Sequence, residues 1–174
     1  MKYAKIVKYD ITNGPGFRTV LFTQGCSHHC PGCFNPETWD LGGGKDFRKD
    51  EEDLVIALCK EEHCAGLSIL GGEPLLERNL VALELLLKRF HEECPGKDVW
   101  LWTGYTLEEL RSKAVNDVID LCDVIIDGPF IKEKKDPSLF YAGSTNQRMW
   151  VRENDRLLLQ CEMPKVKTQH ADKH

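Results

Sequence analysis

Thr19-Val20-Leu21-Phe22-Thr23-Gln24-Gly25 is a short apolar run that ends at glycine, and it leads directly into a segment with three cysteines. Three more runs of this kind follow, at residues 67–71, 99–104 and 124–128. Each is short, carries β-branched, aromatic or leucine side chains, and ends at a glycine. This combination predicts four buried strands.

Helical patterns separate the runs. One places Leu80, Leu83, Leu87 and Phe90 at steps of three and four residues, which gives a single apolar stripe. We expect Asn79 to cap its start, and Pro95-Gly96 to end it. A second helix is expected over residues 51–62, with Asp50 near its cap. Thr106 and Glu109 fit a capping box at the start of a short third helix.

The alternation of strands and helices predicts an α/β protein with a mainly parallel sheet. A chain of 174 residues is short for a closed barrel of eight units, so we expect an open, partial (β/α) barrel. We assign residues 1–164 to a single domain and expect the polar tail at 165–174 to be disordered. In such sheets ligands bind beyond the carboxyl ends of the strands. Polar and cysteine-rich segments follow all four predicted strands, so they are expected around one mouth.

Charge and hydropathy narrow the class of protein. Lys and Arg total 23 against 28 Asp and Glu, which gives a net charge of -5 and disfavours a nucleic-acid binder. No apolar run approaches the 18 or so residues of a membrane span, and no apolar segment of a secretory signal follows Met1. We therefore expect a cytoplasmic protein without a membrane partner.

Cysteine content is the unusual feature. The chain has eight cysteines, and the cytosol keeps thiols reduced, so a disulfide framework is disfavoured. Cys26, Cys30 and Cys33 fall within eight positions, whereas the other five are scattered and are expected to be buried filler. Thiolates at this spacing can hold an iron–sulfur cluster or, with a fourth ligand such as His28 or His29, a zinc ion.

Two weaker signals accompany this cluster. Cys30-Pro31-Gly32-Cys33 alone matches a thioredoxin-like dithiol, although such a dithiol has no need of Cys26. Gly71-Gly72-Glu73 is either a turn that ends a strand or a backbone that a ligand can approach closely. The three-cysteine segment favours the second interpretation.

Together, Cys26-x-x-x-Cys30-x-x-Cys33 and Gly71-Gly72-Glu73 resemble the radical S-adenosylmethionine superfamily. Further motifs resemble one of its families, the activating proteins of anaerobic ribonucleoside-triphosphate reductases. These motifs, which lie between about Tyr9 and Arg152, are 13–19, 34–39, 100–106, 127–130 and 143–148. Phe34 stands where Tyr or His is more usual, and the stretch after Arg152 has no counterpart that we can interpret.

The resemblance implies a [4Fe-4S] cluster held by Cys26, Cys30 and Cys33, and S-adenosylmethionine bound at its open iron. Reductive cleavage of that cofactor would yield a radical that takes a hydrogen atom from a glycine of the large reductase subunit. The radical chemistry belongs to the cofactor, so no catalytic side chain is expected. A flavodoxin-type protein is the expected electron donor.

The resemblance also implies which residues contact S-adenosylmethionine. The cysteine segment would contribute Gly32, Cys33 and Phe34, and the methionine end would meet Gly71, Gly72 and Glu73.

Other residues have weaker claims to a role. Arg18 is expected to be solvated, with the cofactor carboxylate or the partner as the functional alternative. Thr103 and Asp127 are expected to form turns, with ribose contact as the alternative. His28 and His29 are expected to be loop residues rather than ligands.

Two competing functions remain open at this point. One is another radical S-adenosylmethionine enzyme, such as a pyruvate formate-lyase activase or a protein like 7-carboxy-7-deazaguanine synthase. The other is a zinc-binding interaction module.

Overall fold

The four apolar runs form the centre of one eight-stranded sheet in the computed structural model, which describes residues 1–110, 112–113 and 115–160. The tail assigned to residues 165–174 lies outside this range. The central strands run parallel to one another, as expected, in the order β2 (Phe17–Thr23), β4 (Cys64–Gly71), β5 (Asp98–Trp102) and β6 (Val124–Asp127).

Antiparallel strands extend the sheet at both sides, and the sequence patterns did not predict them. On one side β1 (Lys2–Asp10) pairs with β2, and β3 (Lys45–Asp46) pairs with β1. On the other, β7 (Arg148–Glu153) pairs with β6, and β8 (Arg156–Leu159) pairs with β7. The sheet is therefore mixed rather than parallel throughout, and it is open, because β3 and β8 form its two ends.

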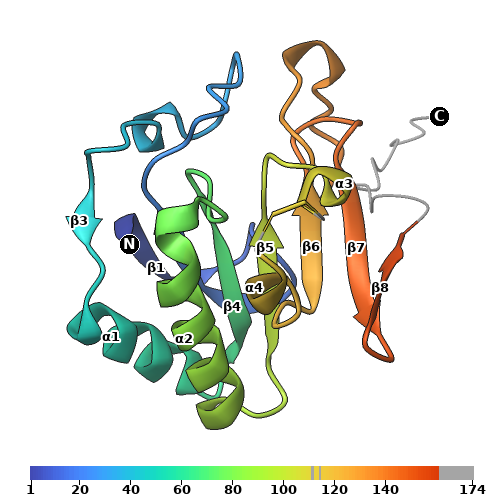
Figure 1. The fold of residues 1–174 in the computed structure, drawn as a ribbon. Coiled ribbons are helices and arrows are strands. Elements are labelled where there is room, and N and C mark those ends of the chain that lie inside the picture. Colours follow the sequence, from blue (N-terminus) through green and yellow to red (C-terminus); the bar gives the residue numbers. More distant parts are fainter. Residues whose placement is uncertain (111, 114, 161–174) are drawn as a thin grey trace, which may run out of the picture.

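Helices cover one face of this sheet, as Figure 1 shows for α1 (Lys49–Lys60), α2 (Glu77–Glu93) and α4 (Asn116–Ile119). Alternate strand residues point toward them because side chains alternate across a strand. Leu21, Ile69 and Leu101 pack in this way against helix residues such as Leu87 and Phe90, and all five are fully buried. This layer is the main core.

Two helix starts differ from the sequence expectation. The helix α2 begins at Glu77, so Asn79 lies within its first turn instead of capping it. The Asn79 amide donates hydrogen bonds to the carbonyls of Glu73 and Pro74 (3.2 Å each). The helix α1 begins at Lys49, with Arg48 rather than Asp50 at its cap. Each difference reflects a local bonding choice that apolar spacing does not encode.

The short helix α3 (Leu107–Leu110) confirms its expected capping box. The backbone amide of Thr106 donates to Glu109 Oε2 (2.7 Å), and the amide of Glu109 donates to Thr106 Oγ1 (3.3 Å). Two single-turn helices, η1 (Pro36–Thr38) and η2 (Lys132–Lys134), lie in loops. None of the helices in the described part of the chain combines the length and apolar character that a membrane span requires.

The other face of the sheet carries a second, smaller apolar cluster. Trp100, Val124 and Ile126 form it, and Trp102 and Tyr141 pack against it. Trp102 Nε1 donates to the Tyr141 carbonyl (2.6 Å), and the Trp100 and Tyr141 rings meet edge to face at 4.9 Å. A segment far along the chain is thereby held across this face.

Candidate metal and cofactor site

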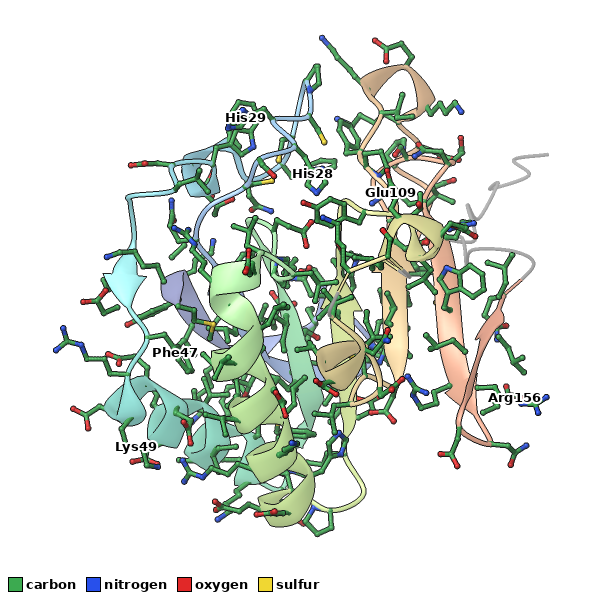
Figure 2. The ribbon with its side chains drawn as sticks, in the orientation of Figure 1. His28, His29, Phe47, Lys49, Glu109 and Arg156 are labelled. Carbon is green, nitrogen blue, oxygen red and sulfur yellow. The ribbon has the colours of Figure 1, made fainter. Side chains whose placement is uncertain are left out.

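The three clustered cysteines share one loop that follows the carboxyl end of β2. Cys26 is buried and Cys30 and Cys33 are partly exposed, and all three thiols are free. The amide of Cys33 donates to the carbonyl of Cys30 (3.0 Å), which closes a tight turn in which Gly32 has a φ of 77°. Figure 2 shows His28 and His29, from the same loop, in the upper part of the molecule.

Backbone amides are directed at the sulfur atoms of this loop. The amide of Asn35 donates to Cys33 Sγ (3.4 Å). Burial raises the pKa of the Cys26 thiol, while hydrogen bonds from the amides of His28 and His29 act in the opposite direction. Burial likewise raises the pKa of the Cys30 thiol, while a hydrogen bond from the backbone of Phe130 lowers it. These donors suit thiolates, because hydrogen bonds to sulfur stabilise its negative charge.

In the described part of the chain, no three His, Cys, Asp or Glu side chains converge on a point where one metal ion would bind. The thiolates of an iron–sulfur cubane bind different irons, so they do not have to converge in this way. The donor set therefore fits an iron–sulfur cluster: three free thiols on one loop, with amides aimed at sulfur.

Gly71-Gly72-Glu73 is joined directly to the start of the cysteine loop. The amide of Gly72 donates to the carbonyl of Thr23 (2.9 Å), and that of Glu73 donates to the carbonyl of Gly25 (2.8 Å). A β-carbon on Gly72 would meet the Gly25 carbonyl, so the glycine is required by a close approach of backbone to backbone. The ends of β2 and β4 are thus fixed side by side.

The Glu73 side chain is fully buried and accepts four hydrogen bonds. Oε1 accepts from Thr103 Oγ1 and the amide of Leu75, both at 2.9 Å. Oε2 pairs with the amide of Gly104 and with His28 Nε2, both at 2.8 Å. A buried carboxylate is tolerable when its lone pairs are satisfied in this way. The carboxylate therefore links three segments of the protein: the cysteine loop, the residues after β4 and the residues after β5.

Thr103 and Asp127, the two residues considered for ribose contact, also have internal partners. Thr103 bonds to Glu73, as above. Asp127 is fully buried, pairs with the Arg148 guanidinium (Nε to Oδ1, 2.9 Å) and accepts from the amide of Leu107 (2.8 Å). Through these hydrogen bonds Thr103 and Asp127 hold the ends of their strands and the turns that follow.

Arg18 is neither solvated nor near the cysteine loop, which corrects the expectation from its residue type. It lies near the amino end of β2, opposite the end that leads to Cys26, and is 1% exposed. Its Nε donates to Ser68 Oγ (2.7 Å), and its Nη1 pairs with Asp98 Oδ1 (2.7 Å). Ser68 Oγ in turn donates to the carbonyl of Asn13 (2.6 Å). Arg18 therefore anchors the turn before β2 to the sheet.

Phe34 directly follows Cys33 and is 61% exposed. It meets the Phe130 ring edge to face at 5.3 Å, and Lys135 Nζ lies 5.2 Å from the ring centroid. Gly143 packs so tightly here that a β-carbon on it would fall 2.7 Å from the Phe34 ring. The segment that crosses the second face of the sheet thus reaches the cysteine loop.

An open groove of about 460 Å³, which no sequence pattern predicted, lies beside that segment. Its walls come from two segments: Ile11, Thr12, Gly14, Pro15, Gly16 and Phe17, and Leu139, Phe140 and Tyr141. Ile11, Phe17 and Phe140 are 67%, 50% and 41% exposed, which is a concentration of large apolar side chains on the surface. Such a concentration marks an interaction site more often than chance exposure does.

Comparisons with known proteins agree with the interpretation of the three cysteines as ligands of an iron–sulfur cluster. A family model described as "4Fe-4S single cluster domain" matches residues 12–150. The anaerobic ribonucleoside-triphosphate reductase-activating protein of Salmonella typhimurium is 47% identical over 149 residues, which are 84% of this chain and 96% of that protein. Proteins of the same name from Escherichia coli and Enterobacteria phage T4 are 45% and 37% identical, over 84% and 86% of this chain and 96% and 94% of their own. This chain belongs to the family of anaerobic ribonucleoside-triphosphate reductase-activating proteins.

Membership of the activating-protein family narrows the interpretations that the cysteines alone left open. The matched residues include Cys26, Cys30, Cys33 and the Gly71-Gly72-Glu73 segment. The 4Fe-4S description supports the cluster over zinc or a dithiol, and the names of the relatives support a reductase activase over other radical S-adenosylmethionine enzymes. The resemblance read from the motifs is therefore confirmed.

Proposed function

We propose that this chain activates an anaerobic ribonucleoside-triphosphate reductase by forming a glycyl radical on its large subunit. One observation carries the proposal. Three free thiols, Cys26, Cys30 and Cys33, lie on one loop beyond parallel strands, in a chain whose relatives are named activating proteins of that reductase. We assign the thiols to a [4Fe-4S] cluster with one iron left for S-adenosylmethionine.

The cluster and S-adenosylmethionine, when bound, supply the radical that removes a hydrogen atom from the glycine of the reductase. The protein has to bind the cofactor, orient it and keep water away. We assign its two walls to Gly32, Cys33 and Phe34 on one side, and to Gly71, Gly72 and Glu73 on the other. The exposed Phe34 ring offers an apolar surface for stacking.

The methionine end of the cofactor would meet main-chain groups rather than the Glu73 carboxylate. That carboxylate already accepts four hydrogen bonds, so Glu73 contributes by holding the Gly71-Gly72 segment in place. Gly71 and Gly72 carry no side chain that would block an approaching ligand.

We assign the apolar groove beside Phe17 and Phe140 to the reductase segment that carries the glycine. Tyr141 lines the groove, and Gly143 touches Phe34. Two residues of chain span at most about 7 Å, so the groove wall reaches the cysteine loop within that distance. Most of the groove wall precedes β2, at the end of the strand opposite the cysteine loop, so a peptide would reach the proposed cofactor where it leaves the groove past Tyr141.

Three further assignments complete the proposal. The mixed, open sheet would be the partial barrel of the radical S-adenosylmethionine fold. An external one-electron donor of the flavodoxin type would reduce the cluster. The protein would work in the cytosol, where thiols stay reduced.

Electron paramagnetic resonance tests the proposal. Protein reconstituted without oxygen is mixed with a reductant, S-adenosylmethionine and an anaerobic reductase of the type that the relatives activate. We expect about four irons per chain and a glycine-centred doublet on the reductase. Protein that takes up stoichiometric zinc without sulfide, or that cleaves S-adenosylmethionine without producing the doublet, would contradict it.

A further inference from the structure

We propose that His28 is a positioning residue. Through its hydrogen bond to Glu73, it holds the cysteine loop at a fixed position relative to the ends of β4 and β5. The inference rests on the proposed function and deepens it, because it assigns a role in placing the cluster to a side chain that binds no iron.

Glu73 fixes the relative position of these segments. Its buried carboxylate takes hydrogen bonds from Leu75 just beyond β4, from Thr103 and Gly104 just beyond β5, and from His28 in the cysteine loop. The bond from Leu75 is local, and the bonds from Thr103 and Gly104 join segments that follow neighbouring parallel strands, whose positions the sheet already fixes. The fourth bond adds a side-chain link to the part of the cysteine loop beyond Cys26, whereas the start of the loop at Gly25 is held by the backbone bond from Glu73.

His28 is well placed to transmit this position. It lies two residues after Cys26 and two before Cys30, so a shift of its side chain moves both sulfur-bearing residues. Its bond links the segment from Ser27 to Gly32 with the residues just beyond β4 and β5, and the same segment also receives a hydrogen bond at the Cys30 thiol from the backbone of Phe130, beyond β6. The link needs only a donor at Nε2, so it does not depend on the charge of the ring.

The imidazole is also held sterically. It meets the Tyr105 ring edge to face at 4.5 Å, and a β-carbon on Gly104 would lie 2.5 Å from its Cδ2 atom. The ring is mostly covered, with 17% of the side chain exposed. Packing on Tyr105 and Gly104 thus fixes the orientation of the imidazole ring, and the hydrogen bond to Glu73 fixes its distance from the carboxylate.

The consequence concerns binding of S-adenosylmethionine. In the proposed site the cofactor bridges the cysteine loop and the Gly71-Gly72 backbone, so the spacing of these two segments determines how well it binds. Without the bond to Glu73 the loop still carries three thiols, and the cluster still forms. The cofactor would then meet a loop that samples several positions, at a cost in affinity.

Three variants separate the bond from the packing. His28→Phe keeps a ring against Tyr105 but has no donor. His28→Gln lacks the ring but places an amide donor at a similar reach. His29→Asn is the matched control, because His29 is the next residue, packs against Trp39 and has a φ of 47°, which Asn tolerates. Each protein is reconstituted with iron and sulfide in the absence of oxygen, and its iron content is measured.

The first readout is a titration of the reduced cluster with S-adenosylmethionine, followed by electron paramagnetic resonance. We expect equal iron content in all four proteins. Half-saturation should require at least ten-fold more cofactor in His28→Phe, and should stay within two-fold of wild type in His28→Gln and His29→Asn. Half-saturation within two-fold of wild type in His28→Phe would overturn the inference.

The second readout needs no cofactor. Hydrogen exchange of amides 26–33 in the metal-free protein should be faster in His28→Phe than in wild type and unchanged in His28→Gln. Equal exchange in His28→Phe and wild type would overturn the inference. If His28→Phe does not fold, His28→Ala takes its place in both measurements with the same thresholds.

Different results would overturn the proposed function and the proposed role of His28. A wild-type protein that takes up no iron–sulfur cluster overturns the proposed function and this inference with it. A wild-type protein that holds the cluster and binds S-adenosylmethionine, beside a His28→Phe variant that behaves in the same way, overturns this inference alone.

Discussion

A β-carbon on Gly72 would lie 2.3 Å from the carbonyl oxygen of Gly25, which is closer than any side chain can come. The two glycines lie just beyond the ends of the neighbouring parallel strands β2 and β4, and the cysteine loop starts at Gly25. The glycine at position 72 is thus demanded by the protein's own backbone, whatever ligand binds there. The contact fixes where the cysteine loop leaves the sheet.

Gly72→Ala should therefore lower the free energy of unfolding by about 3 kcal/mol, since a backbone oxygen cannot move aside as a side chain can. Denaturant unfolding of the metal-free protein measures the effect. Gly42→Ala is the control, because the nearest atom to its β-carbon would be Asp40 Oδ1 at an ordinary 3.5 Å. Equal stability of the two variants would show that β2 and β4 separate easily at this point.

Cys30→Ala should abolish binding of the cluster, because two thiolates do not hold a cubane. Cys122→Ala is the matched control, since Cys122 is a free thiol 1% exposed in the core. It should keep full iron content and lose about 1 kcal/mol of stability through the small cavity. Iron and sulfide analysis after anaerobic reconstitution distinguishes the two, and loss of iron from Cys122→Ala would mean that the ligand set is wrong.

Sequence patterns predicted the four central strands because buried parallel strands have a simple signature, an apolar run with glycine at its end. Strand β7 escaped because its charged and apolar residues mix, and all but one of them are partly buried. Asn79 was misplaced because its residue type favours a cap, while its actual partners are the carbonyls of Glu73 and Pro74. Neither feature has a periodic signal.

The candidate site divides in the same way. The cysteines and Gly71-Gly72-Glu73 are local motifs, so spacing alone reveals them. The burial of Arg18 depends on Ser68 and Asp98, which are 50 and 80 residues away, and the bond from His28 to Glu73 spans 45 residues. Pairs at such distances become visible only once the strands are assembled.

Arg18→Met should destabilise the protein by about 2–4 kcal/mol, because it leaves Asp98 and Ser68 without their partner. The loss stays moderate since the Asp98 side chain is 40% exposed and remains hydrated. Arg156→Met, on the exposed strand β8, is the control and should change stability by less than about 0.5 kcal/mol. Chemical denaturation measures both, and a stable Arg18→Met variant with weakened S-adenosylmethionine binding would restore the cofactor role that its position excludes.

The capping box of α3 should make stability depend on pH. Hydrogen bonds from the backbone amide and the hydroxyl of Thr106 hold the pKa of Glu109 below its usual range. The folded pKa is lowered, so the carboxylate stabilises the fold above the pKa of the unfolded chain, about 4.3, and this contribution is lost as pH falls through the folded value. Glu109→Ala should thus be less stable than wild type at neutral pH, and the difference should shrink from about pH 5 downward.

Urea unfolding at a series of pH values checks this expectation. Glu62→Ala is the control, because it removes an exposed carboxylate that does not lie at the start of a described helix, and it should change stability by less than about 0.5 kcal/mol at neutral pH. A difference for Glu109→Ala that persists undiminished at low pH would show that the side chain acts through packing and not through its charge.

The apolar groove offers the sharpest test of how the reductase docks. Phe17→Ser removes a ring that is half exposed in the groove wall, and Leu85→Ser removes an apolar side chain that is 59% exposed on α2, which covers the other face of the sheet. If the groove binds the reductase, Phe17→Ser should weaken that association by about ten-fold, the effect of losing one well-packed contact, and Leu85→Ser should leave it unchanged. Cleavage of S-adenosylmethionine without the reductase should stay within two-fold of wild type in both, because neither residue contacts the cysteine loop. Equal glycyl-radical yields for the two variants at limiting reductase would place the docking surface elsewhere.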